Sequence, residues 1–447
     1  MGRFTLLCLG FVIVSACGSV KDVGHLPDAP PAGDAGTDAV TRGTVRVTVL
    51  DPSNTGAPAV GANVVFLDPD GTLVKRVATD TTGKAQADVL PGASVASVAL
   101  QNNAYQIQAV LAVRPGDDLI LGVKNADTTS IGTFTVSFPA YTVVTPASYT
   151  VAGACGTASS FPPPAGGPPP ASVTMTFNNS CKLDTMEIVV QANDGNGNPL
   201  AVLDKTGVAL LLNGSTTLSG AYQSPRNFTA SYTNVNSLVT SMSTTRRVPD
   251  AFGLSASASA SNPTATQVLT LTGAVGSGAR VETQLISGSR SIQLVRQTIA
   301  GTAASYGLDL GATLLPWLGT PTFDVASGKI LLPTDTTGTT TATPDLLELL
   351  MSYQRTDPVT GITTTFSWTI FSPVAGDITL PSLPPEAGNV MPTASDAVTA
   401  RAVMVESDGI ANYDAIRNDL NAALATYAGN RAPGTTLRAA FSPLNLR

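Results

Sequence analysis

Few side chains in this sequence belong to the types that carry nucleophilic or metal-dependent chemistry. The single histidine, His25, lies eight residues after Cys17 in a stretch rich in Pro, Ala, Gly and Asp. A Ser-His-Asp or Cys-His arrangement needs its histidine held in a folded pocket, so neither can be built here. Zinc sites need clustered His and Cys ligands, which the sequence lacks. We therefore expect no catalytic residues, no metal and no cofactor.

Carboxylates are the chemistry that remains, because a glycosidase needs only two positioned acids. Asp117 and Asp118 are candidates for binding a metal ion and Glu348 for acid–base work, but no spacing pairs them with partner groups. A Ser-Lys dyad would draw on the seven lysines, and no spacing indicates one. Isolated carboxylates are usually solvated surface groups. A carboxylate-based hydrolase is therefore the least favoured alternative.

A calcium site is the other metal hypothesis, and it rests on Asp194, Asn196 and Asn198. These residues match the opening of a calcium-binding loop. The sixth position of that loop holds Pro199 instead of glycine, and the twelfth holds Lys205 instead of glutamate. A plain turn is the favoured interpretation.

The four cysteines divide into two groups. Cys8 lies in an apolar N-terminal run and Cys17 follows it, which leaves Cys155 and Cys181 in the body of the protein. In an oxidising compartment this pair predicts a disulfide that closes a loop of roughly 27 residues and stabilises the fold by about 3 to 4 kcal/mol. The alternative is two buried free thiols.

The N-terminus has the three-part layout of a secretory leader. Arg3 precedes an apolar run, Phe4 to Val14, and small residues follow it. A run of 11 residues is well short of the roughly 20 that a helix needs to span a bilayer, which disfavours a permanent transmembrane anchor.

The residues Val14-Ser15-Ala16-Cys17 resemble the bacterial lipobox, although Leu is commoner than Val at its first position. The resemblance implies a signal peptide over 1–16 and a lipidated Cys17 that attaches the chain to a membrane; the alternative is an ordinary cleaved signal. Residues 17–42 hold few large apolar side chains and predict a flexible tether. The residue after Cys17 is not Asp, which fits the outer membrane and leaves the periplasmic or surface face open.

Length and composition describe the rest of the chain. The 447 residues are enough for about three domains. Charged residues make up 12% and the hydrophobic set 43%, with abundant Thr, Ser, Gly and Pro, which predicts an all-β protein of short strands and turns. The formal net charge of −7 disfavours nucleic acid as a partner.

The first folded domain is expected over 43–138. Val45, Val47 and Val49 alternate as in a half-buried strand, and tight turns are expected at Asp68–Gly71 and Asp80–Gly83. This stretch, to about residue 100, resembles the carboxypeptidase regulatory-like, transthyretin-like β-sandwich. Such domains carry no peptidase site of their own.

Two further β-rich domains are expected. Residues 188–200, a strand followed by a Gly-Asn-Pro turn, resemble bacterial immunoglobulin-like domains and predict a β-sandwich over 139–245. Its proline-rich stretch 161–170 is interpreted as a displayed loop, with partner docking as the alternative. Residues 246–447 predict a β-rich domain with a hairpin around the turn 357–361, in which Trp368 belongs to the core.

A short amphipathic helix is expected at about 411–428, because five apolar residues there follow helical spacing: Tyr413, Ile416, Leu420, Leu424 and Tyr427. We expect this helix to pack on the last sandwich, with binding of a partner helix as the alternative. The fold class is thus all-β, with tandem β-sandwiches and one short C-terminal helix. The function we expect is a non-catalytic binding or structural module of the cell envelope that contacts a protein or glycan. A carbohydrate-binding or adhesion protein is the alternative, but aromatic residues make up only 5% of the chain.

Overall fold

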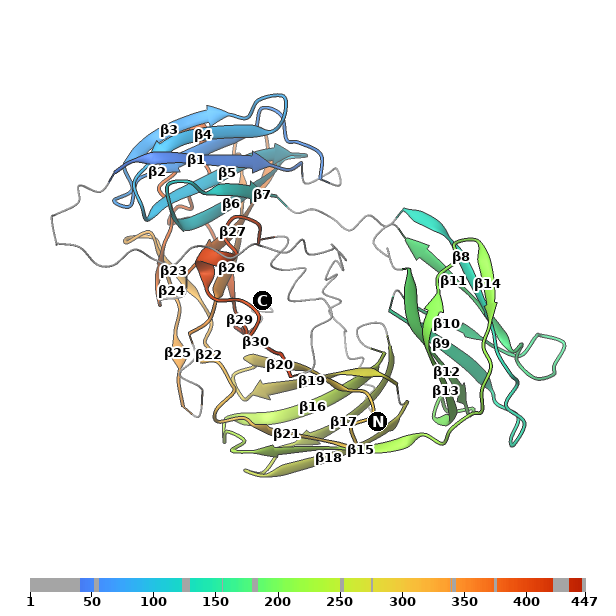
Figure 1. Cartoon of the computed structure of the whole chain (residues 1–447). Coiled ribbons are helices and arrows are strands. Elements are labelled where there is room, and N and C mark those ends of the chain that lie inside the picture. Colours follow the sequence, from blue (N-terminus) through green and yellow to red (C-terminus); the bar gives the residue numbers. More distant parts are fainter. Residues whose placement is uncertain are drawn as a thin grey trace, which may run out of the picture.

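The chain folds almost entirely into β-strands, which confirms the all-β class. The computed structural model describes residues 41–443, apart from 52–55, 123–128, 155, 179–183, 250–252, 275, 338, 340–342, 374–375 and 421–433. Three sandwiches and a bridging β-sheet make up this part of the chain (Figure 1). Within it, no helix is long and apolar enough to span a bilayer.

The first sandwich is built from seven strands: β1 (Gly43–Val49), β2 (Asn63–Leu67), β3 (Leu73–Ala78), β4 (Lys84–Val89), β5 (Ala93–Gln101), β6 (Ala104–Val113) and β7 (Asp118–Leu121). One layer has the order β4-β1-β7 and the other β3-β2-β5-β6. The predicted alternation in β1 is confirmed, because Val45, Val47 and Val49 are all buried between the layers. Both predicted turns form, closed by hydrogen bonds from Gly71 to Asp68 and from Gly83 to Asp80.

The second and third sandwiches also have seven strands each. Those of the second are β8 (Ser130–Ser137), β9 (Ser148–Gly153), β10 (Gly156–Ser160), β11 (Ser172–Asn178), β12 (Thr185–Asn193), β13 (Pro199–Ala209) and β14 (Gly214–Thr217). Those of the third are β15 (Arg226–Thr233), β16 (Val239–Val248), β17 (Leu254–Ser261), β18 (Gln267–Gly273), β19 (Gly278–Ser287), β20 (Ile292–Ala300) and β21 (Ser305–Asp309).

All three sandwiches share one topology. In each, the first strand pairs antiparallel with the fourth and parallel with the seventh. The opposite layer has the order third, second, fifth, sixth in every case. The chain therefore repeats one seven-stranded unit three times, which confirms a tandem arrangement of β-sandwiches.

A bridging sheet joins the first sandwich to the third. It consists of β27 (Thr363–Ser372), β26 (Leu346–Thr356), β29 (Thr399–Ser407) and β30 (Thr436–Phe441), in that order. Its outer strands pair with the sixth strand of each sandwich, β27 with β6 and β30 with β20. The result is one continuous sheet of 12 strands that runs from β17 to β3.

The predicted hairpin is confirmed as β26 and β27, and Trp368 is buried with 1% of its surface exposed. Trp368, Leu349 and Tyr353 form a core on one face of the bridging sheet. Short elements cover that core: β22 (Trp317–Leu318), β23 (Thr322–Asp324), β24 (Lys329–Leu331), β25 (Thr334–Asp335), β28 (Ile378–Thr379) and the 3-10 turn η1 (Pro385–Ala387). The remaining 3-10 turn, η2 (Tyr413–Ala415), lies against the first sandwich.

The units begin and end at other residues than the sequence suggested. Residue 138 directly follows β8, which belongs to the second sandwich, and residue 245 lies inside β16 of the third. The described strands thus divide at 122–129 and 218–225, and the described residues of 310–443 form the bridge, its covering layer and the segment that packs on the first sandwich. The reason is physical: each sandwich needs its first strand to complete the layer that holds the fourth and the seventh.

The expected C-terminal helix is only partly within the described residues. Over 411–420 the chain forms η2 and the buried positions Ile416 and Leu420, and residues 421–433 lie outside the described part. Tyr413, Ile416 and Leu420 are buried, but they pack into the core of the first sandwich and not on the last one, so the predicted packing partner is wrong.

Candidate functional site

The sequence-predicted cysteine and histidine positions lie outside the described residues. This holds for Cys17 and His25 and for the predicted disulfide partners Cys155 and Cys181. The carboxylates Asp117, Asp118 and Glu348 all lie within the described residues.

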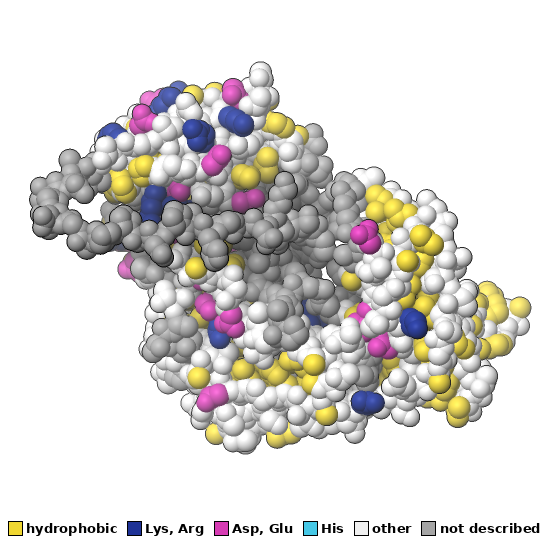
Figure 2. Space-filling model, in the orientation of Figure 1, with side chains coloured by type: hydrophobic (Ala, Val, Ile, Leu, Met, Phe, Trp, Pro, Cys, Tyr) yellow, Lys and Arg dark blue, Asp and Glu magenta, His cyan; other side chains and the backbone are white. Residues whose placement is uncertain are grey.

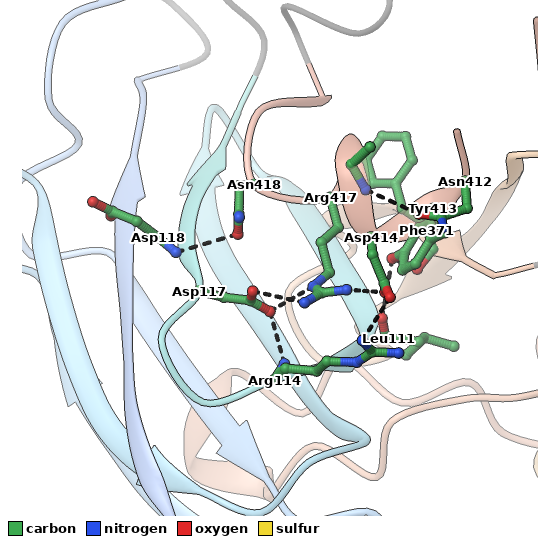
Figure 3. A network of polar contacts seen from close by, with 11 residues as sticks. Leu111, Arg114, Asp117, Asp118, Phe371, Asn412, Tyr413, Asp414, Arg417 and Asn418 are labelled. Carbon is green, nitrogen blue, oxygen red and sulfur yellow. Dashed lines mark hydrogen bonds and ion pairs between the residues drawn. The ribbon is translucent and has the colours of Figure 1, made fainter. Parts of the chain in front are cut away.

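Asp117 is not a metal-binding candidate in this environment, because its carboxylate is occupied by Arg417. Arg417 Nε lies 2.6 Å from Asp117 Oδ2 and Nη2 lies 2.8 Å from Oδ1 (Figure 3). The backbone N–H of Arg114 donates to the same Oδ2 at 2.7 Å. Both members of the ion pair are buried. This arrangement ties the C-terminal segment to the β6–β7 turn.

The network continues around this ion pair. Asp414 contacts both Arg417 and Arg114, whose Nη1 lies 2.6 Å from Asp414 Oδ2. Asn418 accepts a hydrogen bond from the backbone N–H of Asp118 at 3.2 Å, through its side chain (Figure 3). These contacts all join one part of the chain to another. They account for the position of the Asp117 carboxylate and of the Asp118 backbone, so no ligand is needed to explain either.

Tyr413 anchors the same segment from the inside of the sandwich. Its hydroxyl lies 3.0 Å from the backbone carbonyl oxygens of Leu111 and Phe371, one in β6 and the other in β27 (Figure 3). Burial raises the pKa of Tyr413, so the phenol stays protonated and acts as a donor. Tyr413 thus joins the first sandwich to the bridging sheet at the point where β6 and β27 pair.

Glu348 lies on β26, beside Phe371 of β27 and Val403 of β29. Burial raises the pKa of Glu348, and the charge of Arg401 opposes this effect. Glu348 and Asp117 lie in separate clusters of contacts, since Asp117 is held by Arg417 and Glu348 is balanced by Arg401. The structure therefore does not bring Asp117 and Glu348, the acids that the sequence suggested, together in one site.

Asp194, Asn196 and Asn198 form the plain turn between β12 and β13. Asp194 Oδ1 accepts from the backbone N–H groups of Asn196 and Asn198 at 2.8 Å each. Hydrogen bonds from the side chain and backbone of Asn198 hold the pKa of Asp194 below its ordinary value. Among the described residues, no three His, Cys, Asp or Glu side chains come together as metal ligands would.

The exposed candidate surface lies at one end of the second sandwich, on the loops 138–147 and 161–171. Val143, Val144 and Phe161 expose 79%, 55% and 66% of their surface there. In Figure 2, hydrophobic side chains gather over this sandwich. Large exposed apolar side chains that group together are typical of interaction surfaces.

Both loops are held in place by contacts at their bases. Phe138 donates a backbone hydrogen bond to Ala171 at 3.0 Å, which ties the start of one loop to the end of the other. The hydroxyl of Ser160 donates to the carbonyl of Pro170 at 2.8 Å and closes the proline-rich loop. Tyr141 packs edge-on against Tyr222, with ring centroids 5.4 Å apart. The loops therefore stand on a fixed base.

The sequence contains a signal for this surface that motif analysis missed. No charged residue occurs from Thr128 to Cys181, although the whole chain carries 24 Lys and Arg and 31 Asp and Glu. Loops without charged side chains cost less free energy to cover with another molecule, because none of their side chains is an ion that must be desolvated. A search for charge-free stretches, rather than for catalytic motifs, would have found it.

A carboxyl pair at the edge of the second sandwich was also missed. Glu187 on β12 and Asp204 on β13 come from adjacent antiparallel strands, next to a bulge in the pairing. Burial, followed by a shared hydrogen bond with Glu187 and its charge, raises the pKa of Asp204 to about 7.

No protein-family model matches this sequence, and no curated protein matches it. One solved structure with similar parts is the Bacillus anthracis TIE protein, at 10% identity and a TM-score of 0.15, covering 60% of this chain and 50% of that one. The chain thus spans half the length of that protein. Two B repeat units of the collagen binding protein of Staphylococcus aureus match at 12% identity and a TM-score of 0.13, covering 81% of this chain and 92% of that one. With TM-scores of this size, neither likeness bears on function.

Proposed function

We propose that this chain is a cell-envelope lipoprotein that acts as a non-catalytic binding or structural module. The observation that carries the binding role is the pair of uncharged loops, 138–147 and 161–171, at one end of the second sandwich, where Phe161 exposes 66% of its surface. Three rigid sandwiches in one chain suit a scaffold that holds such loops away from its point of attachment. The partner we propose is another protein of the envelope or an external surface.

The attachment is proposed at Cys17, on the strength of the lipobox-like residues before it. Several acyl chains, each contributing about 0.8 kcal/mol per buried methylene, make such an anchor effectively permanent. The tether 17–42 then separates the membrane from β1. The first sandwich is proposed as a carboxypeptidase regulatory-like domain, in line with its turn residues.

Radiolabelled palmitate tests the anchor in cells that express the full chain or the Cys17→Ala variant. Label on the parent protein alone supports the lipoprotein, and label on neither rejects it. External protease on intact cells separates the two faces: digestion indicates the cell surface, and protection indicates the periplasm.

Site-specific photo-cross-linking tests the binding surface independently. A photoreactive residue replaces Val143 or Phe161 in intact cells, and a third variant carries it at Val359 as the matched control. Val359 exposes 90% of its surface on the β26–β27 turn, far along the chain from the proposed loops. We expect one discrete cross-linked species from positions 143 and 161 only. Equal cross-linking at 359, or none at 143 and 161, rejects the surface.

A glycan partner is the weaker alternative. Sugar-binding surfaces normally use aromatic platforms, and both tryptophans of this chain are buried, Trp317 at 3% exposure and Trp368 at 1%. Binding above background on a glycan array, lost in Phe161→Ser, would favour this alternative over a protein partner.

A further inference from the structure

The second sandwich rests on one end of the third through a small apolar contact. Ala152, Val189 and Val202 of the second sandwich meet residues of the third there: Val248, Leu254, Ala274 and Ala279. Most of these side chains are small, so the apolar area they bury is modest. Two hydrogen bonds between Val202 and Gln223, 2.8 and 2.9 Å long, join the same strand to the linker that follows β14.

A carboxyl pair lies at the rim of this contact. Glu187 and Val189 alternate with the core residues Ile188 and Val190 on β12, so they lie on the outer face that meets the third sandwich. Glu187 is also the group that reaches across: its carboxylate accepts from the backbone N–H of Ser277 at 2.5 Å and from the Ser277 hydroxyl. Asp204 lies beside Glu187, and its Oδ1 is buried without a hydrogen-bond partner among the described residues.

The charged groups around the pair come from both sandwiches. On the second sandwich they are Asp184, just before β12, and Lys205, which follows Asp204 and is exposed. On the third they are Arg246 and Arg247 at the end of β16 and Arg280 at the start of β19. Arg246 points into its own sandwich, where Nη1 donates to the Ala274 carbonyl at 2.5 Å. Arg280 and Arg247 act on Glu282 of β19.

We propose that Glu187 and Asp204 form a proton-dependent latch, which holds the second sandwich against the third when Asp204 is protonated and loosens that contact when Asp204 ionises. This inference goes beyond the binding role, because it concerns the position of the sandwich that carries the exposed loops. The ligand that controls the latch is the proton that Asp204 binds.

The mechanism follows from the hydrogen bonds. Protonated Asp204 donates to the Glu187 carboxylate, which keeps its single negative charge and both hydrogen bonds from Ser277. Loss of that proton leaves two adjacent carboxylates at a half-buried rim, where their negative charges repel each other. Separation of the sandwiches relieves this repulsion in part, because it returns Asp204 to water.

Asp204 has a pKa of about 7 in the docked state, raised first by burial and then by the hydrogen bond and charge of Glu187. We expect undocking to expose Asp204 to more water and so to lower that pKa. The docked state therefore binds the proton more tightly, and docking weakens as pH rises towards about 7 and is constant above about 8. One linked proton changes the docking equilibrium by up to about tenfold per pH unit between the two pKa values.

Hydrogen–deuterium exchange of the full chain between pH 4.5 and 8.5 tests the latch, after correction for intrinsic exchange rates. The readout is protection of peptides that contain Ser277 and Glu187, relative to peptides from the β26–β27 hairpin. Small-angle scattering at the same pH values reports whether the chain expands. We expect protection of the Ser277 peptide to fall by at least tenfold between pH 5 and 8, with the hairpin unchanged.

Three variants test whether Asp204 and Glu187 cause the pH dependence. Asp204→Asn stays neutral and still donates to Glu187, so its protection should not depend on pH. Glu187→Gln removes the neighbouring charge, so the midpoint should move to lower pH. Asp194→Asn, on an exposed turn of the same sandwich, should keep the parent profile. Parent protection that is constant with pH, or an Asp204→Asn variant with the parent slope, overturns the proposal. If Asp204→Asn does not fold, an unchanged midpoint in Glu187→Gln overturns it.

Discussion

Arg417 donates two hydrogen bonds, of 2.6 and 2.8 Å, to the carboxylate of Asp117, which lies 300 positions earlier in the sequence. Arg417 belongs to the segment between β29 and β30, and Asp117 to the turn before β7. Both side chains are buried. If one of them is removed, the charge of the remaining side chain is left without a partner and without water around it. This pair therefore couples the C-terminal part of the chain to the first sandwich.

Arg417→Leu should destabilise the protein by about 3 to 5 kcal/mol, because it leaves the charge of Asp117 buried without a partner. Denaturant unfolding measures the change in the free energy of unfolding. Arg114→Ala is the matched control: Arg114 also pairs with Asp414, but its side chain is 57% exposed, so its loss should cost under about 1 kcal/mol. Equal costs for the two variants would contradict the structural role of Arg417.

Gly388→Ala should destabilise the layer that covers the bridging sheet. Gly388 has φ +120°, and an added Cβ would lie 2.7 Å from Cε1 of Tyr105. Tyr105 stacks on Phe366, which stacks on Tyr353, with centroid distances of 5.2 and 4.7 Å, so the ring has little freedom to move. Backbone strain and the steric clash together should cost about 2 to 4 kcal/mol.

Gly361→Ala separates these two causes. Gly361 also has a positive φ, +71°, but an added Cβ there meets nothing within 4 Å. Only the conformational cost remains, about 1 kcal/mol. Thermal unfolding of both variants provides the comparison, and a Gly388→Ala variant no less stable than Gly361→Ala would show that the Tyr105 ring yields.

Local features of this fold were predictable from the sequence. The alternation of Val45, Val47 and Val49 gave β1, and the turn at 357–361 gave the hairpin that buries Trp368. Both depend on side chains within a few residues of one another, so the period-2 pattern and turn chemistry are sufficient.

Non-local features were not predictable in the same way. The pairing of β27 with β6 joins Phe366 to Tyr105, and nothing in either strand identifies the other. The start of the third sandwich at Arg226 depends equally on strands that complete its layers later in the chain. Asp117 was a plausible ligand only while Arg417 was not known to be its neighbour.

Asp396→Asn should weaken the protein in a pH-dependent way. Asp396 Oδ2 accepts from Arg355 Nη2 at 2.6 Å and from the backbone N–H of Thr393 at 2.7 Å. Burial raises the pKa of Asp396, but the hydrogen bonds from Arg355 and Thr393 outweigh it and hold that pKa below the ordinary value of 3.8. The folded state thus favours the carboxylate.

Because the folded-state pKa is depressed, the stability that Asp396 contributes is present above about pH 4 and is lost as pH falls through the folded pKa. The parent should exceed Asp396→Asn by about 1 to 3 kcal/mol at pH 7, and the difference should shrink below pH 4. Urea unfolding at pH 7, 5 and 3 measures it. Asp357→Asn is the comparison for an exposed aspartate whose pKa is lowered mainly by backbone N–H groups, and its effect should be smaller than that of Asp396→Asn at every pH.

Cys155 and Cys181 both fall between strands of the second sandwich. The β9–β10 connection follows Gly153, which pairs with Ile188 near the start of β12. The β11–β12 connection ends at Asp184, directly before that strand. The described residues that flank the two connections thus lie at one end of the sandwich, while Cys155 and Cys181 themselves lie outside the described residues. The disulfide stays a prediction, with two free thiols as its alternative.

If the disulfide forms, the double variant Cys155→Ser/Cys181→Ser should lose about 3 to 4 kcal/mol of unfolding free energy under oxidising conditions, because a loop of roughly 27 residues is no longer closed in the unfolded chain. Reduction of the parent protein should lower its stability to the level of the variant and leave the variant unchanged. Thiol titration of the unfolded, non-reduced parent gives the direct count. Reactive thiols at both positions would favour the alternative of buried free cysteines, in which case reduction should change nothing.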